Sequence, residues 1–118
     1  MAEAEVIRRV ADKGPCVIVG RCANYVLRER NDCLHLFFHA PLEQRIHRAQ
    51  EEYGIAETYE AARAHTLKQD KARASYYNYL TTGRWGDCHE YDLTVNTGLG
   101  LDTTVEMLAK LLGKEVRA

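Results

Sequence analysis

The chain has 118 residues, of which 46% are hydrophobic, 28% charged and 8% aromatic. This composition is typical of one small globular domain over residues 1–118, and it excludes a disordered, collagen-like or disulfide-scaffold chain. Sixteen Lys and Arg residues against seventeen Asp and Glu residues give a formal net charge of -1, so the chain has no overall positive field to hold nucleic acid or an anionic membrane. Any anion it binds must be held by a local site.

No apolar run approaches the roughly 18 residues of a membrane-spanning helix, and the N-terminal segment lacks the pattern of a secretory signal. Both observations favour a cytoplasmic protein. The cysteines show neither a CxxC pair nor a zinc-ribbon spacing, which predicts free thiols in a reducing compartment and no metal site. They are Cys16, Cys22, Cys33 and Cys88.

The first third of the chain predicts a helix, a strand and a second helix. An apolar stripe indicates a helix over residues 2–12 that ends at Gly14. Residues 16–19 are apolar and mostly β-branched, which is typical of a strand buried on both faces. This run breaks at Gly20, and residues 21–30 predict the second helix.

The middle of the chain predicts another strand and two helices. Residues 34–39 form a second run of the buried-strand type. Pro41 suits the first turn of the helix that follows, which Gly54 closes after Tyr53. A long, Ala-rich and basic helix is expected from about Glu57 to Leu80.

The C-terminal part predicts a third, weaker strand over residues 92–96 and a last helix. Thr103 and Glu106 have the spacing of a capping box that opens this helix. We expect the helix to bury four apolar side chains, which are Leu101, Val105, Leu108 and Leu112.

The alternation of strands and helices defines the predicted fold class. Such a chain requires right-handed crossovers, and it therefore predicts an α/β fold with a parallel sheet and flanking helices. Three strands make a thin sheet for this architecture, and a parallel α/β domain that begins with a helix resembles an incomplete one. We therefore expect an incomplete strand order and a further segment upstream.

A candidate anion site follows the first predicted strand. Ligands of open α/β sheets bind outside the carboxyl ends of the strands, and Gly20 and Arg21 lie at such a position. Gly20 would allow a close backbone approach, and Arg21 offers a two-pronged donor to a phosphate. The alternative is that Gly20 only turns the chain and that Arg21 is a solvated surface residue.

A second candidate site consists of basic side chains on the predicted helices between residues 42 and 84. Arg45 and Arg48 precede a group of cations on the long helix, and such arms could close over a phosphoryl group and supply positive charge. A solvated helix face explains these charges as well, because Arg48 with Glu52 and Asp70 with Arg73 have the spacing of ordinary ion pairs. The remaining cations are Arg63, Lys68, Lys71, Arg73 and Arg84.

Aromatic and histidine side chains give weaker indications of a ligand-binding site. Residues 76–79 (YYNY) could stack on a base, although burial against the neighbouring helices explains them better. His39, at the carboxyl end of its predicted strand, could face a ligand, whereas His35 is expected in the core or at the sheet edge.

Five segments, taken in chain order, resemble the bacterial cytidylate kinase-like family. The resemblance covers nearly the whole chain. It implies a three-layer P-loop nucleoside-monophosphate-kinase fold, with ATP and Mg²⁺ as the phosphoryl-donor complex and a nucleoside monophosphate such as CMP as the acceptor. The segments are residues 14–23 (GPCVIVGRCA), 39–46 (HAPLEQRI), 70–79 (DKARASYYNY), 85–87 (WGD) and 91–97 (YDLTVNT).

The resemblance also implies roles for individual residues. Gly20 and Arg21 are similar to the family's Gly-Arg-Asp element, whose Arg contacts the acceptor. Asp70 and Arg73 are similar to a lid element that grips nucleotide and phosphates. The Asp of the first element is Cys22 here, and Thr66-Leu67 stands where the family has Arg-Asp, so the recognition of cytosine or its ribose is in doubt.

The sequence contains no G-x-x-x-x-G-K-[ST] loop, whose amides and Lys hold the donor phosphates in this fold. The chain therefore resembles the C-terminal part of such a kinase. We expect it to hold acceptor and lid elements, to bind no ATP or Mg²⁺ alone, and to be inactive alone.

Three functions remain open at this point. The first is a part of a nucleotide kinase, the second is a non-catalytic nucleotide-binding or oligomerisation module, and the third is a phosphotransferase with a non-nucleotide acceptor. The resemblance also implies that the strand leading into the P-loop lies between the strands expected at residues 16–19 and 34–39. Without it, these two strands either pair directly or recruit a second copy of the chain through their open edges, and we expect a homo-oligomer.

Overall fold

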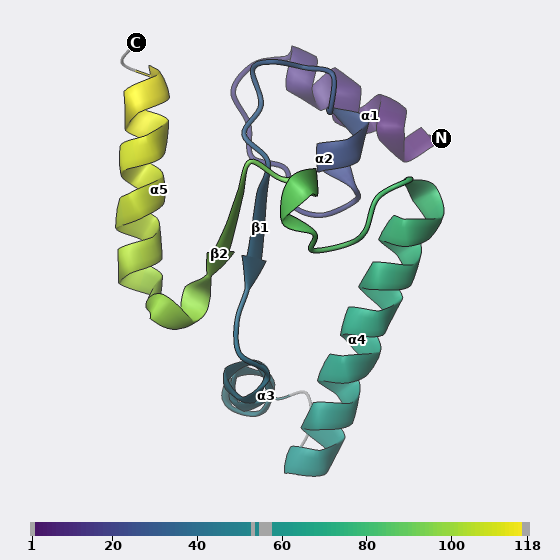
Figure 1. Ribbon diagram of the computed structural model, residues 1–118, viewed down its shortest axis with the longest axis vertical. Helices are drawn as coiled ribbons and strands as arrows, with labels where there is room; N and C mark the ends of the chain where they lie inside the picture. Colours follow the sequence, from purple (N-terminus) through teal and green to yellow (C-terminus); the bar gives the residue numbers. More distant parts are fainter. Residues whose placement is uncertain (1, 53, 55–57, 117–118) are drawn as a thin grey trace. The chain divides into compact units, whose positions relative to one another are not determined.

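The computed structural model describes residues 2–52, 54 and 58–116, which form helices and a two-stranded sheet (Figure 1). The elements in chain order are α1 (Ala2–Asp12), α2 (Ala23–Val26), β1 (Leu36–His39), α3 (Leu42–Glu51), α4 (Tyr59–Leu80), the 3-10 helix η1 (Cys88–Glu90), β2 (Leu93–Asn96), the 3-10 helix η2 (Thr97–Leu99) and α5 (Leu101–Val116).

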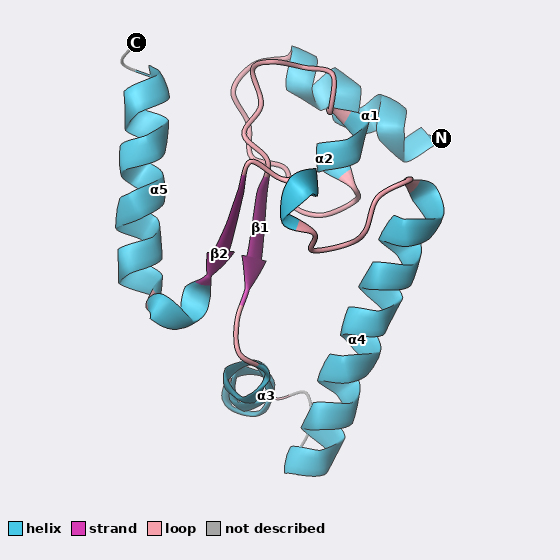
Figure 2. Cartoon of the chain, viewed as in Figure 1, coloured by secondary structure: helices cyan, strands magenta, loops and turns pink. Residues whose placement is uncertain are grey.

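The sheet pairs β1 with β2, and the two strands run in the same direction (Figure 2). The pairing begins just before the strands, where the backbone N–H groups of Asp92 and Leu93 donate to the carbonyl of His35 at 2.8 and 3.2 Å. The Asp92 carboxylate also accepts a hydrogen bond from the His35 backbone N–H at 2.7 Å. The predicted α/β class with a parallel sheet is therefore confirmed.

The described residues divide into two compact units. The first unit comprises Met1–Leu36 and Lys71–Leu93, and the second comprises Phe37–Asp70 and Thr94–Ala118. The helix α4 contributes its first half to the second unit and its second half to the first. Each unit buries its own apolar side chains.

The core of the first unit lies on α1, on the turn after α2 and on the second half of α4. Ile7, Leu27 and Tyr77 are each no more than 6% exposed. The helix α1 places Ala4 and Ile7 one turn apart on one face, which is the spacing that packs a helix against a neighbour. The helix α2 lies in contact with α1.

The core of the second unit centres on Ile46 of α3, which is fully buried. Pro41 precedes this helix and fixes the entry of the chain, as the sequence predicts for a proline at a helix start. The hydroxyl of Tyr59 at the start of α4 donates to the Glu43 carboxylate of α3 at 2.6 Å. Other buried residues of this unit are Ala49, Ala62, Thr66, Val95 and Thr104.

The predicted strand over residues 16–19 is wrong. These residues form no strand, and Val17 and Val19 are 90% and 86% exposed. A β-branched run becomes a strand only when a neighbouring strand satisfies its backbone N–H and C=O groups. Within the described part of the chain no strand pairs with it, so the sheet has two strands rather than three.

The predicted helix over residues 21–30 is shorter than expected. Gly20, Arg21 and Cys22 have φ values of 72°, 62° and 56°, and a right-handed helix cannot start until the backbone leaves this left-handed region. The helix α2 therefore covers Ala23–Val26 only, and turns follow it.

The predicted capping box and the predicted burial of the last helix are also wrong. The helix α5 begins at Leu101, directly after Gly100 with its φ of 119°, so Thr103 lies inside the helix. Leu101, Val105 and Leu112 are 47–64% exposed, and Leu108 is half-buried. The side of α5 that faces the protein carries Thr104, whose hydroxyl donates to the Gly100 carbonyl at 2.8 Å.

The remaining boundaries agree with the sequence to within a few residues. The helix α3 ends at Glu51, and Tyr53, which the sequence assigns to the same helix, lies outside the described residues. Glu57, the expected start of the long helix, lies outside them as well. None of the described helices is both long enough and apolar enough to cross a membrane.

Candidate functional site

The first candidate element is the loop of Gly20, Arg21 and Cys22 in the first unit. Three successive residues with positive φ make it a tight left-handed turn, and the left-handed conformation costs roughly 1–2 kcal/mol for each non-glycine residue. The turn is held at its exit, where Asn24 Nδ2 donates to the hydroxyl of Tyr77 at 2.9 Å and to the carbonyl of Glu90 at 3.2 Å. These bonds fix the direction in which the loop leaves the turn.

Arg21 projects from this loop and remains largely exposed. Its Nη1 atom lies 3.1 Å from Oε1 of Glu3, with 68% of the arginine side chain accessible. The other oxygen of Glu3 accepts a hydrogen bond from the Tyr76 hydroxyl at 3.3 Å. An exposed pair of this kind contributes only about 0–1 kcal/mol, so a phosphate could displace Glu3 from Arg21 at little cost.

Cys22 occupies the position where the family that this sequence resembles has an aspartate, and it cannot take over the role of that aspartate. The residue is only 8% exposed. Burial, followed by the nearby Glu3 carboxylate, raises the pKa of the Cys22 thiol. The group therefore stays a neutral thiol at physiological pH, which neither accepts a strong charged hydrogen bond nor attacks as a thiolate.

A polar cluster around Tyr77 supports the loop, and sequence reasoning missed it. The Tyr77 hydroxyl lies 3.4 Å from Oε1 of Glu90 and accepts from Asn24. Burial raises the pKa of Tyr77 to about 12. Gly83 lies against this cluster, since an ideal Cβ at this position would lie 1.1 Å from Oε1 of Glu90 and would displace the glutamate side chain.

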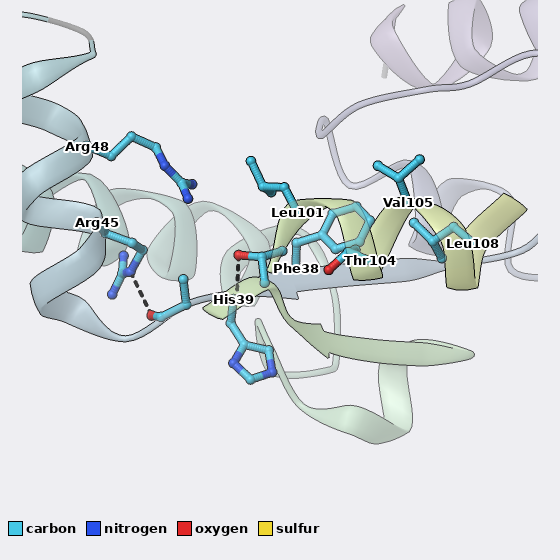
Figure 3. Close-up of a pocket in the computed structure, with 10 residues that line it drawn as sticks. Phe38, His39, Arg45, Arg48, Leu101, Thr104, Val105 and Leu108 are labelled. Carbon is cyan, nitrogen blue, oxygen red and sulfur yellow. Dashed lines mark hydrogen bonds between the residues drawn. The ribbon is translucent and has the colours of Figure 1, made fainter. Parts of the chain in front are cut away.

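The second candidate element is a pocket of about 390 Å³ that lies wholly within the second unit (Figure 3). Phe38 of β1 and the exposed face of α5 form its apolar side, where Leu101, Val105 and Leu108 gather around the aromatic ring (Figure 3). Arg45 and Arg48 of α3 lie at the other side. Pockets of this size and composition are the usual form of small-molecule sites, with an apolar wall and a few polar groups.

Arg45 is the most firmly held cation of this pocket. Its Nη1 atom lies 2.8 Å from both carboxylate oxygens of Asp70, and its Nε donates to the carbonyl of Ala40 at 3.1 Å. Arg48 is held more loosely, since its Nε is 3.8 Å from Glu52, whose side chain is 65% exposed. The predicted Arg48 and Glu52 pair is therefore confirmed as a long contact.

His39 lines the same pocket but does not point into its apolar part. Its ring turns away from Phe38 and Leu101 (Figure 3), and it stacks on the Phe37 ring with centroids 6.4 Å apart. The backbone carbonyl of His39 accepts a hydrogen bond from the Thr97 hydroxyl at 3.3 Å. This bond ties the end of β1 to the segment after β2.

The structure distributes the predicted site residues over the two units. Gly20, Arg21 and Arg73 belong to the first unit, and Arg45, Arg48 and Asp70 belong to the second. Within the second unit it brings Arg45 and Asp70 together, which the sequence did not predict, because it paired Asp70 with Arg73 instead. Arg73 is exposed on α4, as are Arg63, Lys68 and Lys71, and Arg84 is exposed beyond the end of this helix.

The residues present do not fit a protein-held Mg²⁺. In the part of the chain that the structure describes, the three neighbouring groups able to hold a metal are Asp87, Cys88 and His89. Thiol and imidazole ligands do not suit magnesium, which prefers carboxylates, phosphates and water. Asp70 is already engaged with Arg45. These groups are therefore unsuited to hold Mg²⁺.

Comparisons with known proteins show what this chain is similar to. The model of the cytidylate kinase-like family matches residues 1–99. A crystal structure of an uncharacterized protein from Eubacterium ventriosum is similar over 94% of this chain, with a TM-score of 0.86 and 29% identity. A protein named uronate isomerase from Corynebacterium glutamicum is 32% identical over 94 residues, which are 80% of this chain. The matched parts make up 63% of the solved chain and 17% of the isomerase, so this chain spans less than two thirds of either.

Proposed function

This chain belongs to the cytidylate kinase-like family, and we propose that the protein transfers the γ-phosphoryl group of ATP to a nucleoside monophosphate such as CMP, with this chain supplying acceptor-binding and lid residues. The observation that carries the proposal is the family match together with the arginines of the two candidate elements. Phosphoryl transfer needs little covalent chemistry from the protein and depends on positioning and positive charge. Arginine side chains provide both.

The proposed roles follow from how each arginine is held. Arg21 would bind the acceptor phosphate, since its exposed guanidinium leaves Glu3 at little cost. Arg73, exposed on the second half of α4, would act with it as a lid residue. Arg45 and Arg48 would neutralise the charge that develops on the transferred group, because they are the cations of a pocket with apolar walls.

ATP, with Mg²⁺ held by its own phosphates, is the donor that the family implies, and the sequence has no G-x-x-x-x-G-K-[ST] loop to hold it. The proposal therefore assigns no donor-binding role to any residue of this chain beyond Arg45 and Arg48. A homo-oligomer and a cytoplasmic location are part of the same proposal, and the free thiols fit a reducing compartment.

The test is a coupled ADP-release assay on the intact gene product with ATP and CMP. We expect turnover, and we expect Arg21→Ala and Arg73→Ala to lower kcat/KM by about 1–3 kcal/mol of transition-state binding, the scale of a lost charge-assisted contact. Arg28→Ala is the matched control, because Arg28 is also exposed but lies over the Tyr25 ring at 4.0 Å. Equal kinetics for the three variants would leave Arg21 and Arg73 as surface charges.

A second candidate function is phosphoryl transfer to a non-nucleotide acceptor, and Cys22 favours it. A buried neutral thiol in place of a carboxylate removes the charged acceptor that would pair with donors on a base or ribose. Turnover with a hydroxyl-bearing sugar and none with nucleoside monophosphates would establish this function. CMP binding without any turnover would instead indicate a non-catalytic nucleotide-binding module.

A further inference from the structure

Asp70 is oriented to hold the Arg45 side chain and not to hold a ligand. Both oxygens of Asp70 lie 2.8 Å from Nη1 of Arg45. Less than a third of either side chain is exposed, with 32% for Arg45 and 23% for Asp70. The lone pairs of this carboxylate are therefore turned toward the guanidinium of α3.

One donor nitrogen of the Arg45 guanidinium is available to a ligand. Its Nε donates to the carbonyl of Ala40 and its Nη1 to Asp70. Its Nη2 atom has no hydrogen-bond partner among residues 2–52, 54 and 58–116. Arg45 also lines the pocket of the second unit, so a fixed guanidinium presents a free nitrogen to any ligand at that side.

Asp70 is negatively charged, which is unfavourable for direct contact with a phosphate. A carboxylate beside an anionic ligand repels it, and a ligand that took Asp70 for itself would leave Arg45 with one anchor fewer. Fixing a long arginine side chain before binding has the opposite effect, since it removes the loss of rotamer freedom that binding would otherwise cause.

We propose that Asp70 is a positioning residue, which holds the Arg45 guanidinium so that Nη2 faces a ligand phosphate, and which does not touch the ligand itself. The inference rests on the proposed function, because that function places a phosphoryl group at Arg45. It differs from the role that the sequence alone indicates for Asp70, which is direct binding of the nucleotide.

The test measures binding of inorganic pyrophosphate to the chain by isothermal titration calorimetry. Pyrophosphate has no ribose or base, so direct contact of Asp70 with a nucleoside cannot contribute. We expect Asp70→Asn to weaken binding about three- to tenfold, the scale of one immobilised long side chain. If Asp70 acted only through its charge, the same variant would bind more tightly, because a negative charge has been removed.

Two further variants make the result specific. Glu52→Gln is the matched control, because it removes the carboxylate of the looser Arg48 pair at 3.8 Å, and we expect it to bind as tightly as the wild type or slightly more tightly. In an Arg45→Ala background, Asp70→Asn should cause no further loss. An equal loss in that background, or tighter binding by Asp70→Asn alone, would overturn the proposal.

A second readout does not depend on any ligand. The Nη nitrogens of Arg45 should give separate NMR signals in the wild type, since the two bonds to Asp70 slow rotation of the guanidinium. Asp70→Asn should merge these signals, while backbone amides far from residue 70 keep their chemical shifts. If the wild type bound no pyrophosphate at millimolar concentration, the proposed function would lose its phosphate site. The Nη signals would then still decide the positioning role, and signals that stay separate in Asp70→Asn would overturn it.

Discussion

Arg21 and Arg45 are both candidate phosphate ligands, and the molecule holds them in different ways. Arg21 stands on a left-handed turn with 68% of its side chain exposed and one contact to a surface glutamate. Arg45 leaves a regular helix, and its head is fixed by both oxygens of Asp70 and by a backbone carbonyl. In the first case the backbone is fixed and the side chain is free, and in the second the side chain itself is fixed.

The difference shows how a fold can prepare cations for different tasks. A free side chain can follow an acceptor as it enters, and it exchanges one weak ion pair for another. A fixed guanidinium loses little entropy when the phosphate arrives, so more of its interaction is available to stabilise the transferred group. This difference supports the proposed roles, which are acceptor binding for the Arg21 loop and charge stabilisation for the Arg45 pocket.

The largest expected effect concerns the segment that leads into the Arg21 loop. Val17 and Val19 are exposed, and in the described residues no strand pairs with the segment that carries them. We propose that this exposed β-branched segment pairs as a strand with a second copy of the chain. We expect a dimer or larger assembly at micromolar concentration, which corresponds to about -8 kcal/mol.

Light scattering coupled to size exclusion measures this association. Val17→Lys and Val19→Lys should shift the chain to a monomer of 13.5 kDa, because charged side chains protect strand edges. Val6→Lys is the matched control, since Val6 is 56% exposed but lies on the helix α1, whose backbone is already paired. A wild-type monomer that unfolds cooperatively at micromolar concentration would show that exposure of residues 16–19 has no consequence for assembly.

The fate of residues 16–19 illustrates how far the sequence alone can predict this fold. The α/β class, the parallel sheet and the long helix α4 follow from local patterns, and all three are confirmed. The strand over residues 16–19 is wrong because its formation depends on a partner strand that the local pattern does not contain. A run of β-branched residues indicates a tendency to form a strand, but it does not identify the strand that would pair with it.

The candidate site shows the same limit at the level of side chains. The helix periodicity correctly placed Arg45, Arg48 and Asp70 on helices, but it paired Asp70 with Arg73, three residues away. The observed partner, Arg45, is 25 residues away in the sequence. Short-range spacing rules describe neighbours within one helix, and a contact between α3 and α4 depends on tertiary packing that they do not include.

The next largest effect tests what holds the Arg21 loop at its exit. Burial raises the pKa of Tyr77 from 10.0 to about 12, so the folded state favours the protonated phenol. The resulting stability is fully present below pH 10 and is lost as the pH rises through about 12, with a total of roughly 2–3 kcal/mol.

Urea unfolding of the wild type and of Tyr77→Phe between pH 8 and 12 measures this contribution. The wild type should lose stability relative to the variant across pH 10–12, because only the wild type must ionise a buried hydroxyl. Tyr79→Phe is the control, since Tyr79 is 86% exposed and its removal should leave the wild-type profile unchanged. Parallel curves for the wild type and Tyr77→Phe would contradict the assignment.

The smallest effect compares the two arginines directly, through the free energy of unfolding without any ligand. Arg45→Ala leaves the largely buried Asp70 carboxylate without its partner, which should cost about 1–3 kcal/mol. Arg21→Ala breaks a pair whose side chains are 68% and 46% exposed, so its cost should be about 0–1 kcal/mol. Adding Asp70→Asn to Arg45→Ala should recover part of the loss, because the unpaired charge is gone, whereas adding Glu3→Gln to Arg21→Ala should change nothing. If both arginines cost the same, or if Asp70→Asn gives no recovery, the two cations are held equally loosely, and the division between a binding arginine and a charge-stabilising arginine fails.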